Sequence, residues 1–292
     1  MLIMEDKFDI RLLQPEDFSQ MYRTFIDAFS KYSVKMDLSK EMFRERIEEK
    51  VNISYNHSVG VFHGEKLIGF IFNSICEYEG IKTAYNGGTG VLMEYWGQEF
   101  TKKMYDFVLP LLRRENVKRC VLEVITTNSS ALRAYQKTGF VKNKNYKCFK
   151  LKKPLDLKTS IPHLKIKRTH PDNLSSYEII ASTSPSMMMM DSSNMLVHNL
   201  KNETCLNALI AGEFVGFFIF QDKTGRISQF GVKNDFRRKG IGRMLMVKAY
   251  ELSRNKSLTV LNIEKSEKAI ISFLTKNGFA NEIDQYEMEM VL

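Results

Sequence analysis

The stretch that decides the fold is Val232-Lys233-Asn234-Asp235-Phe236-Arg237-Arg238-Lys239-Gly240-Ile241-Gly242-Arg243. An apolar strand end leads through a basic turn into a helix, because Leu245 and Leu252 follow Ile241 at helical spacing. The two glycines fall in the first helical turn, where unpaired backbone N–H groups and the helix dipole favour an anion. Glycine there leaves room for phosphate oxygens to approach the backbone. The stretch predicts a pyrophosphate-binding turn.

This stretch resembles the acyl-CoA-binding motif of the GNAT superfamily of N-acyltransferases. In that motif Gln or Arg, two variable residues, Gly, one variable residue, and Gly or Ala hold the coenzyme's pyrophosphate. Every fixed position is matched, and the strand predicted over 226–232 supplies the context that a bare glycine pattern lacks. The alternative is an ordinary basic strand-to-helix turn. The resemblance implies that acetyl-CoA is a co-substrate bound by Val232, Arg237, Arg238, Lys239, Gly240, Ile241, Gly242 and Arg243.

A second signature of the same superfamily follows downstream. Residues 258–263 read as a buried strand, and 267–276 read as a helix that stops at Asn277-Gly278. Phe279 then returns into the core.

An internal repeat organises the chain. Residues 91–101 have the same layout as 232–242; matching Trp96 to Arg237 gives an offset of 237 − 96 = 141, and matching Gly139 to Gly278 gives 278 − 139 = 139. The nearly constant register indicates a tandem duplication. The polar, proline-bracketed segment 152–163 reads as the linker.

The expected fold class is therefore α/β (α+β), with two GNAT-like domains in tandem, over 1–151 and 164–292. The resemblance implies that each has a mixed, mostly antiparallel sheet flanked by helices, and that the two pack as an internal pseudo-dimer. In the first copy the pattern predicts strands at 8–12, 59–63, 67–78, 119–124 and 146–151, a strand ending at Val91, and helices after Pro15, near 40–50, over 100–111 and over 129–137.

The first copy has lost the residues of the binding turn. Trp96 stands at the Arg position, and Glu99 and Thr101 replace the two glycines. A carboxylate and its bulk at Glu99 oppose a phosphate at the helix N-terminus. We therefore expect the N-terminal copy to be degenerate and not to bind acyl-CoA in the usual way.

The second copy has lost the residue that many GNAT enzymes use as the acid. That Tyr lies five residues before the Phe of the second signature and protonates the departing thiolate. The first copy has it as Tyr135, whereas the second has Leu274. The loss should slow acyl transfer without forbidding it, because a thiol with a pKa near about 8.5 leaves tolerably well as a thiolate.

Family members commonly use a Glu on the central strand, or a water chain, as the base. Residues 225–232 offer Ser228 and Gln229 but no carboxylate. Glu264 and Tyr286 are the substitute catalytic candidates, and the alternative for each is a surface or packing role. The segment 182–191 contains four consecutive methionines that could line an acceptor pocket or enter the core. Asp191 beside them could attract a cationic amine or cap a helix.

Composition excludes several classes of function. No stretch approaches the length of a membrane span, and the first residues lack the features of a signal peptide, so we expect a cytoplasmic protein with no membrane partner. The four cysteines and five histidines show no ligand-like spacing, so we expect no metal. The net charge of +9 is spread among 34 acidic residues, so we expect no nucleic-acid partner.

Together these features predict an N-acetyltransferase that moves acetyl from acetyl-CoA to a primary amine of a small molecule or peptide. We expect direct attack, because no nucleophile motif is visible. The alternative is a non-catalytic acyl-CoA-binding or sensing module, suggested by Leu274 and the missing carboxylate. The chain is expected to be a monomer with an internal pseudo-dimer, or a homodimer.

Overall fold

A computed structural model describes residues 8–32, 36, 38–155, 160–169 and 189–292. The chain divides into two compact units. Unit 1 comprises Met1–Asn143 and Tyr286–Leu292, and unit 2 comprises Lys144–Gln285.

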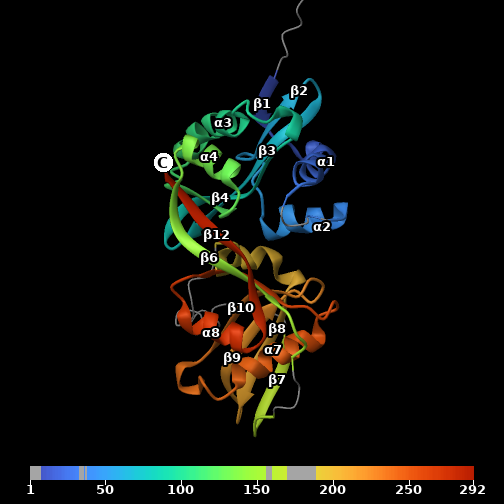
Figure 1. The fold of residues 1–292 in the computed structure, drawn as a ribbon, viewed down its shortest axis with the longest axis vertical. Helices are drawn as coiled ribbons and strands as arrows, with labels where there is room; N and C mark the ends of the chain where they lie inside the picture. The colour runs from blue at the N-terminus through green and yellow to red at the C-terminus, as the bar shows by residue number, and fades with distance from the viewer. Residues whose placement is uncertain (1–7, 33–35, 37, 156–159, 170–188) are drawn as a thin grey trace, which may run out of the picture. The chain divides into compact units, whose positions relative to one another are not determined.

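Unit 1 is built on strands in the order β1-β2-β3-β4-β5, with the last residues of β12 beside β5. Strands β1 to β4 are antiparallel and β4 and β5 are parallel. Helices α1 and α2 cover one face of this sheet, and α3 and α4 cover the other (Figure 1). The elements are β1 (Phe8–Leu12), α1 (Phe18–Ala28), α2 (Lys40–Arg44), β2 (Val59–His63), β3 (Lys66–Tyr78), β4 (Ile81–Val91), α3 (Phe100–Arg114), β5 (Arg119–Ile125), α4 (Ser129–Thr138) and the start of β6 (Val141–Leu151).

Unit 2 has the strand order β6-β11-β10-β9-β8-β7. Only β10 and β11 are parallel among these pairs of described strands. The core under α7 and α8 lies on one face, and α6 packs on the other. The elements are β7 (Leu164–Thr169), α6 (Ser193–Leu196), β8 (Thr204–Ile210), β9 (Glu213–Phe220), β10 (Arg226–Val232), α7 (Ile241–Leu252), β11 (Thr259–Glu264), α8 (Lys268–Lys276) and β12 (Phe279–Val291).

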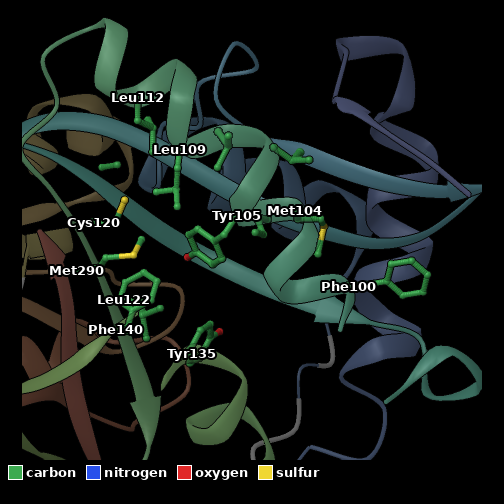
Figure 2. Packing of buried hydrophobic residues seen from close by; sticks show 14 of the residues in the cluster. Phe100, Met104, Tyr105, Leu109, Leu112, Cys120, Leu122, Tyr135, Phe140 and Met290 are labelled. Carbon is green, nitrogen blue, oxygen red and sulfur yellow. The ribbon is translucent and has the colours of Figure 1, made fainter. Parts of the chain in front are cut away.

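Helix spacing explains how these helices attach to their sheets. In α3 the buried residues Phe100, Met104, Val108 and Leu112 recur every four positions, so they form one apolar stripe facing the strands. Figure 2 shows Phe100, Met104 and Leu112 of this stripe in the core of unit 1.

The two units exchange the strands that end the two sequence repeats. Met288 and Met290 of β12 are buried in the core of unit 1, where Met290 joins the cluster of Cys120 and Phe140 (Figure 2). The Leu292 N–H donates to the Lys118 carbonyl at 3.0 Å. Residues 144–151 of β6 pair with β11, and Phe149 belongs to the core of unit 2. Each unit thus contains a strand segment from the other repeat.

The predicted fold class is confirmed, because each unit has mixed, mostly antiparallel strands flanked by helices. The helix predicted near residues 40–50 is α-helical only over Lys40–Arg44 and continues as a π-helix over Glu45–Lys50. The boundaries at 151 and 164 stay a prediction. Within the described ranges, no helix has the length and apolar character needed to cross a membrane.

Candidate active site

The basic turn of unit 2 has the backbone shape that an anion site needs. Strand β10 ends at Val232, and Gly240 caps α7 with φ +84°, in the left-handed region that favours glycine. The first bond of α7 runs from the Met244 N–H to the Gly240 carbonyl at 3.1 Å. The N–H groups of residues 241–243 therefore have no partner within the helix.

Side chains hold this turn in place. The Arg237 Nε donates to the Val232 carbonyl at 2.9 Å, which ties the turn to the end of its strand. The Arg243 Nη1 donates to Asn277 Oδ1 at 2.9 Å, which links α7 to the end of α8. The Lys239 ammonium lies 5.1 Å from the centre of the Phe236 ring.

The glycines of the turn lie close to neighbouring side chains. A Cβ atom on Gly240 would lie 3.3 Å from Ile161 Cδ1, and one on Gly242 would lie 3.3 Å from the Phe273 ring. With cations at 237, 238, 239 and 243, the donor set fits a pyrophosphate. All eight residues predicted to bind the coenzyme lie on β10, this turn or the first turn of α7.

A parallel strand pair opens beside the turn. Strands β10 and β11 pair only at Arg226 with Thr259 and Ile227 with Val260, although β10 continues to Val232. In unit 1, β4 and β5 likewise pair only as far as Tyr85, although β4 continues to Val91. Both units therefore have splayed parallel strands next to the N-terminus of a helix.

The equivalent turn of unit 1 keeps the backbone shape despite its different residues. Trp96 Nε1 donates to the Val91 carbonyl at 2.7 Å, the bond that Arg237 makes in unit 2. Glu99 caps α3 with φ +59°, as Gly240 caps α7. The divergence predicted from the sequence thus lies in the side chains.

The Glu99 carboxylate turns toward α4. It pairs with the Lys137 ammonium at 2.7 Å, and this partner lowers the pKa of Glu99. Because both side chains are exposed, the pair is screened by solvent.

Tyr135, the residue at the acid position of the first repeat, belongs to a buried polar network. Its hydroxyl is hydrogen-bonded to Thr89, and burial raises its pKa to about 12. Asn86 Nδ2 donates to Thr89 Oγ1 at 2.7 Å and to the Tyr105 hydroxyl at 2.6 Å. Figure 2 shows Tyr105 and Tyr135 within the core cluster of unit 1. Unit 1 thus retains a tyrosine hydroxyl that stays protonated at neutral pH.

Unit 2 has replaced this whole network with apolar side chains. The repeat register matches Asn86, Thr89, Tyr105 and Tyr135 to Ile227, Phe230, Met246 and Leu274. Ile227, Met246 and Leu274 are fully buried in the core of unit 2, and Phe230 packs against that core. The change at Leu274 is therefore one part of a concerted replacement.

A buried carboxylate that the sequence did not predict lies beside Ser228 of β10. Glu203, which directly precedes β8, is 4% exposed, and its Oε2 accepts the Ser228 hydroxyl at 2.9 Å. Its Oε1 accepts Asn199 Nδ2 at 2.9 Å and Gln221 Nε2 at 3.1 Å. Ser228 occupies the register shift in β10, between Ile227 and Gln229. No sequence motif could reveal this pair, because Glu203 lies just before β8 whereas Ser228 lies on β10.

The two weaker catalytic candidates belong to different units. Glu264 ends β11 in unit 2, where its Oε1 accepts the Ser266 hydroxyl at 2.8 Å. Tyr286 belongs to unit 1, where the Lys142 ammonium lies 4.1 Å from the centre of its ring. These contacts match the surface and packing alternatives, and the catalytic roles stay predictions.

Asp191 does not cap the helix that follows it, and a role toward a cationic amine stays a prediction. Its carboxylate pairs with Arg226 at 2.7 Å, with both side chains largely buried, and Ser192 is the residue that caps α6. The Asp191 carbonyl accepts Gln229 Nε2 at 2.6 Å. Met190 is buried beside Arg226, whereas Met187 and Met188 lie outside the described residues.

No group of three or more His, Cys, Asp or Glu side chains that could hold a metal ion occurs in the part of the chain that the structure describes.

Comparison with known proteins identifies the fold. The sequence model of the acetyltransferase (GNAT) family matches residues 18–140 and 175–279. A GCN5-related N-acetyltransferase from Sphaerobacter thermophilus superimposes with a TM-score of 0.74 at 14% identity, over 98% of this chain and 96% of that one. A putative acetyltransferase from Pyrococcus horikoshii gives 0.72 at 17% identity, over 100% and 92%. A tandem GNAT protein from the clavulanic acid biosynthesis pathway gives 0.73 at 10% identity, over 98% of both chains. No curated protein sequence matches the chain significantly.

Proposed function

Because the chain belongs to the acetyltransferase (GNAT) family and is an acyltransferase, we propose that it transfers acetyl from acetyl-CoA to a primary amine of a small molecule or peptide. The proposal assigns the coenzyme to unit 2. The amine attacks the thioester directly, without an acyl-enzyme intermediate.

The observation that carries this proposal is the turn at Gly240 beside the splayed end of β10. In the assigned roles, the N–H groups of Ile241, Gly242 and Arg243 bind the pyrophosphate. Arg238, Lys239 and Arg243 supply positive charge to it. Arg237 holds the turn to the Val232 carbonyl at 2.9 Å.

Positioning supplies much of the rate in a direct transfer of this kind. A backbone N–H at the end of β10, such as that of Val232, polarises the thioester carbonyl in this scheme. The side chains around Leu274 are apolar and offer no general acid. The coenzyme thiolate can still leave unprotonated, but the transfer is then slower.

A calorimetric titration of the nucleotide-free protein with acetyl-CoA tests the binding half of the proposal. One site per chain that is lost in Gly240→Glu supports it, and the absence of any binding overturns it. Thiol release from acetyl-CoA is then followed with a panel of primary amines: spermidine, glucosamine, benzylamine and a lysine-containing peptide. Amine-dependent release supports transfer, whereas tight binding without turnover across the panel favours a binding module. The cytoplasmic location and the oligomeric state stay predictions.

A further inference from the structure

We infer that the segment between the repeats, residues 152–163, forms part of the coenzyme site of unit 2, and that its Lys153 binds the ribose 3′-phosphate of coenzyme A. This inference rests on the proposed function and deepens it, because it adds a binding residue outside the motif at 232–243. It also gives a function to a segment that the sequence presents only as a linker.

The two ends of this segment lie beside the two turns that carry the GNAT signatures. At one end the Lys152 N–H donates to the Gly278 carbonyl at 3.0 Å. At the other end Ile161 Cδ1 lies 3.3 Å from the place of a Cβ atom on Gly240. Leu155, between them, is buried in the core of unit 2. The described residues of the segment are therefore attached to unit 2 at three points.

The two turns are also joined to each other. Arg243 Nη1, in the first turn of α7, donates to Asn277 Oδ1 at 2.9 Å, and Asn277 directly precedes Gly278. The Cβ atom of Lys153 lies 4.0 Å from the place of a Cβ atom on Gly278. Lys153 is therefore close to the helix end that Arg243 contacts, and its ammonium is carried on a flexible four-carbon stem. The ribose 3′-phosphate of coenzyme A is one sugar away from the pyrophosphate that we assign to Arg243.

The charge of Lys153 is available to a ligand. Its side chain is exposed, and it forms no ion pair within the residues that the structure describes. The neighbouring Lys152, by contrast, pairs with Glu282. A phosphate that reached Lys153 would gain a charge-assisted contact without displacing a carboxylate.

The other repeat differs at this position. The offset of 139 residues that relates the second signatures also matches Lys153 to Leu292, since 292 − 153 = 139. Leu292 is apolar and packs against the core of unit 1. The repeat that has lost the glycines of the binding turn thus has an apolar residue where the repeat that keeps them has a cation.

The test uses two ligands that differ by one phosphate, coenzyme A and 3′-dephospho-coenzyme A. Calorimetry at low salt, where charge interactions are least screened, measures both affinities. We expect Lys153→Gln to lower affinity for coenzyme A about fivefold, the effect of one exposed ion pair, and to leave affinity for the dephospho form unchanged. Lys223→Gln is the matched control: it removes the same charge from an exposed lysine that precedes β10, at the end of that strand opposite to the turn, and should bind both ligands as wild type does.

A second pair of variants tests the other end of the segment. Ile161→Asp places a carboxylate beside the turn at Gly240, whereas Ile161→Asn has nearly the same shape and no charge. We expect Ile161→Asp to bind coenzyme A and the dephospho form about tenfold more weakly than Ile161→Asn, because the pyrophosphate is common to both ligands.

Three outcomes overturn this inference alone. Lys153→Gln could bind both ligands as wild type does, or lose affinity for both by the same factor; either result removes the contact with the 3′-phosphate. Equal affinities of Ile161→Asp and Ile161→Asn would show that the segment is not part of the site. A wild-type protein that binds neither ligand overturns the proposed coenzyme site, and this inference with it.

Discussion

Trp96 and Arg237 make the same hydrogen bond in the two repeats. Each donates a side-chain Nε hydrogen to the carbonyl five residues earlier, at 2.7 Å to Val91 and at 2.9 Å to Val232. The indole therefore replaces the tether of the turn without replacing the positive charge. The two repeats thus share the geometry of the turn and differ in the charge of its side chains.

Giving the turn of unit 1 the motif residues of unit 2 should create a second acetyl-CoA site. We expect the triple variant Trp96→Arg, Glu99→Gly and Thr101→Gly to bind two molecules of acetyl-CoA per chain, against one for wild type, because the left-handed cap of α3 is already in place. Calorimetry gives the stoichiometry. If the variant folds and still binds one molecule, another part of unit 1 must prevent acetyl-CoA from binding.

A methyl group at Gly240 should weaken coenzyme binding. We expect Gly240→Ala to lower acetyl-CoA affinity by about tenfold, or about 1.4 kcal/mol, because the added carbon meets Ile161 and obstructs the turn. Gly212→Ala is the matched control: Gly212 has a similar φ of +87° in open space, so it introduces the same backbone strain alone. Equal losses of affinity in the two variants would contradict this assignment.

A tyrosine at 274 should act as an acid only with a hydroxyl partner. In unit 1, Tyr135 has Thr89, whereas the matching position in unit 2 is Phe230. We expect Leu274→Tyr alone to leave kcat unchanged and to lower stability by about 1–3 kcal/mol, because its hydroxyl is buried without a partner. Leu274→Tyr with Phe230→Thr should raise kcat by about tenfold or more. Thiol-release kinetics and thermal unfolding separate the two effects.

Removing only one partner of the buried ion pair between Asp191 and Arg226 should lower the stability of unit 2. We expect Asp191→Asn to lower the free energy of unfolding by about 3–5 kcal/mol, because it removes the carboxylate charge that pairs with the Arg226 guanidinium, which is only 12% exposed. The double variant Asp191→Leu with Arg226→Met should lose less. Urea unfolding measures both, and a larger loss in the double variant would refute this account.

Acid should weaken unit 1 through Asp17. Two Arg11 bonds, at 2.7 and 2.9 Å, and the Gln14 N–H lower the pKa of this carboxyl. The stabilisation is therefore present above the unfolded pKa of about 3.9 and is lost as the pH falls through the lower folded value. We expect Asp17→Asn to be less stable than wild type at pH 7 and to show a shallower decline between pH 5 and pH 2. Parallel declines in urea titrations would exclude Asp17 as the source.

Local patterns in the sequence predicted the parts of the site that one segment builds. The turn at Gly240 follows from helix spacing and from the need for a left-handed cap, both properties of adjacent residues. The pair of Ser228 and Glu203 could not be predicted, because its residues are 25 positions apart and meet only through strand register. The same limit applies to the strand exchange, since alternation along β6 and β12 does not specify which sheet receives them.

That exchange also sets an order of events during synthesis. Met288 and Met290 fill the core of unit 1, yet they leave the ribosome after all of unit 2. A chain cut at 152–163 would leave each fragment carrying a strand segment that belongs to the other unit. Separating the two repeats would therefore remove one strand segment from each unit.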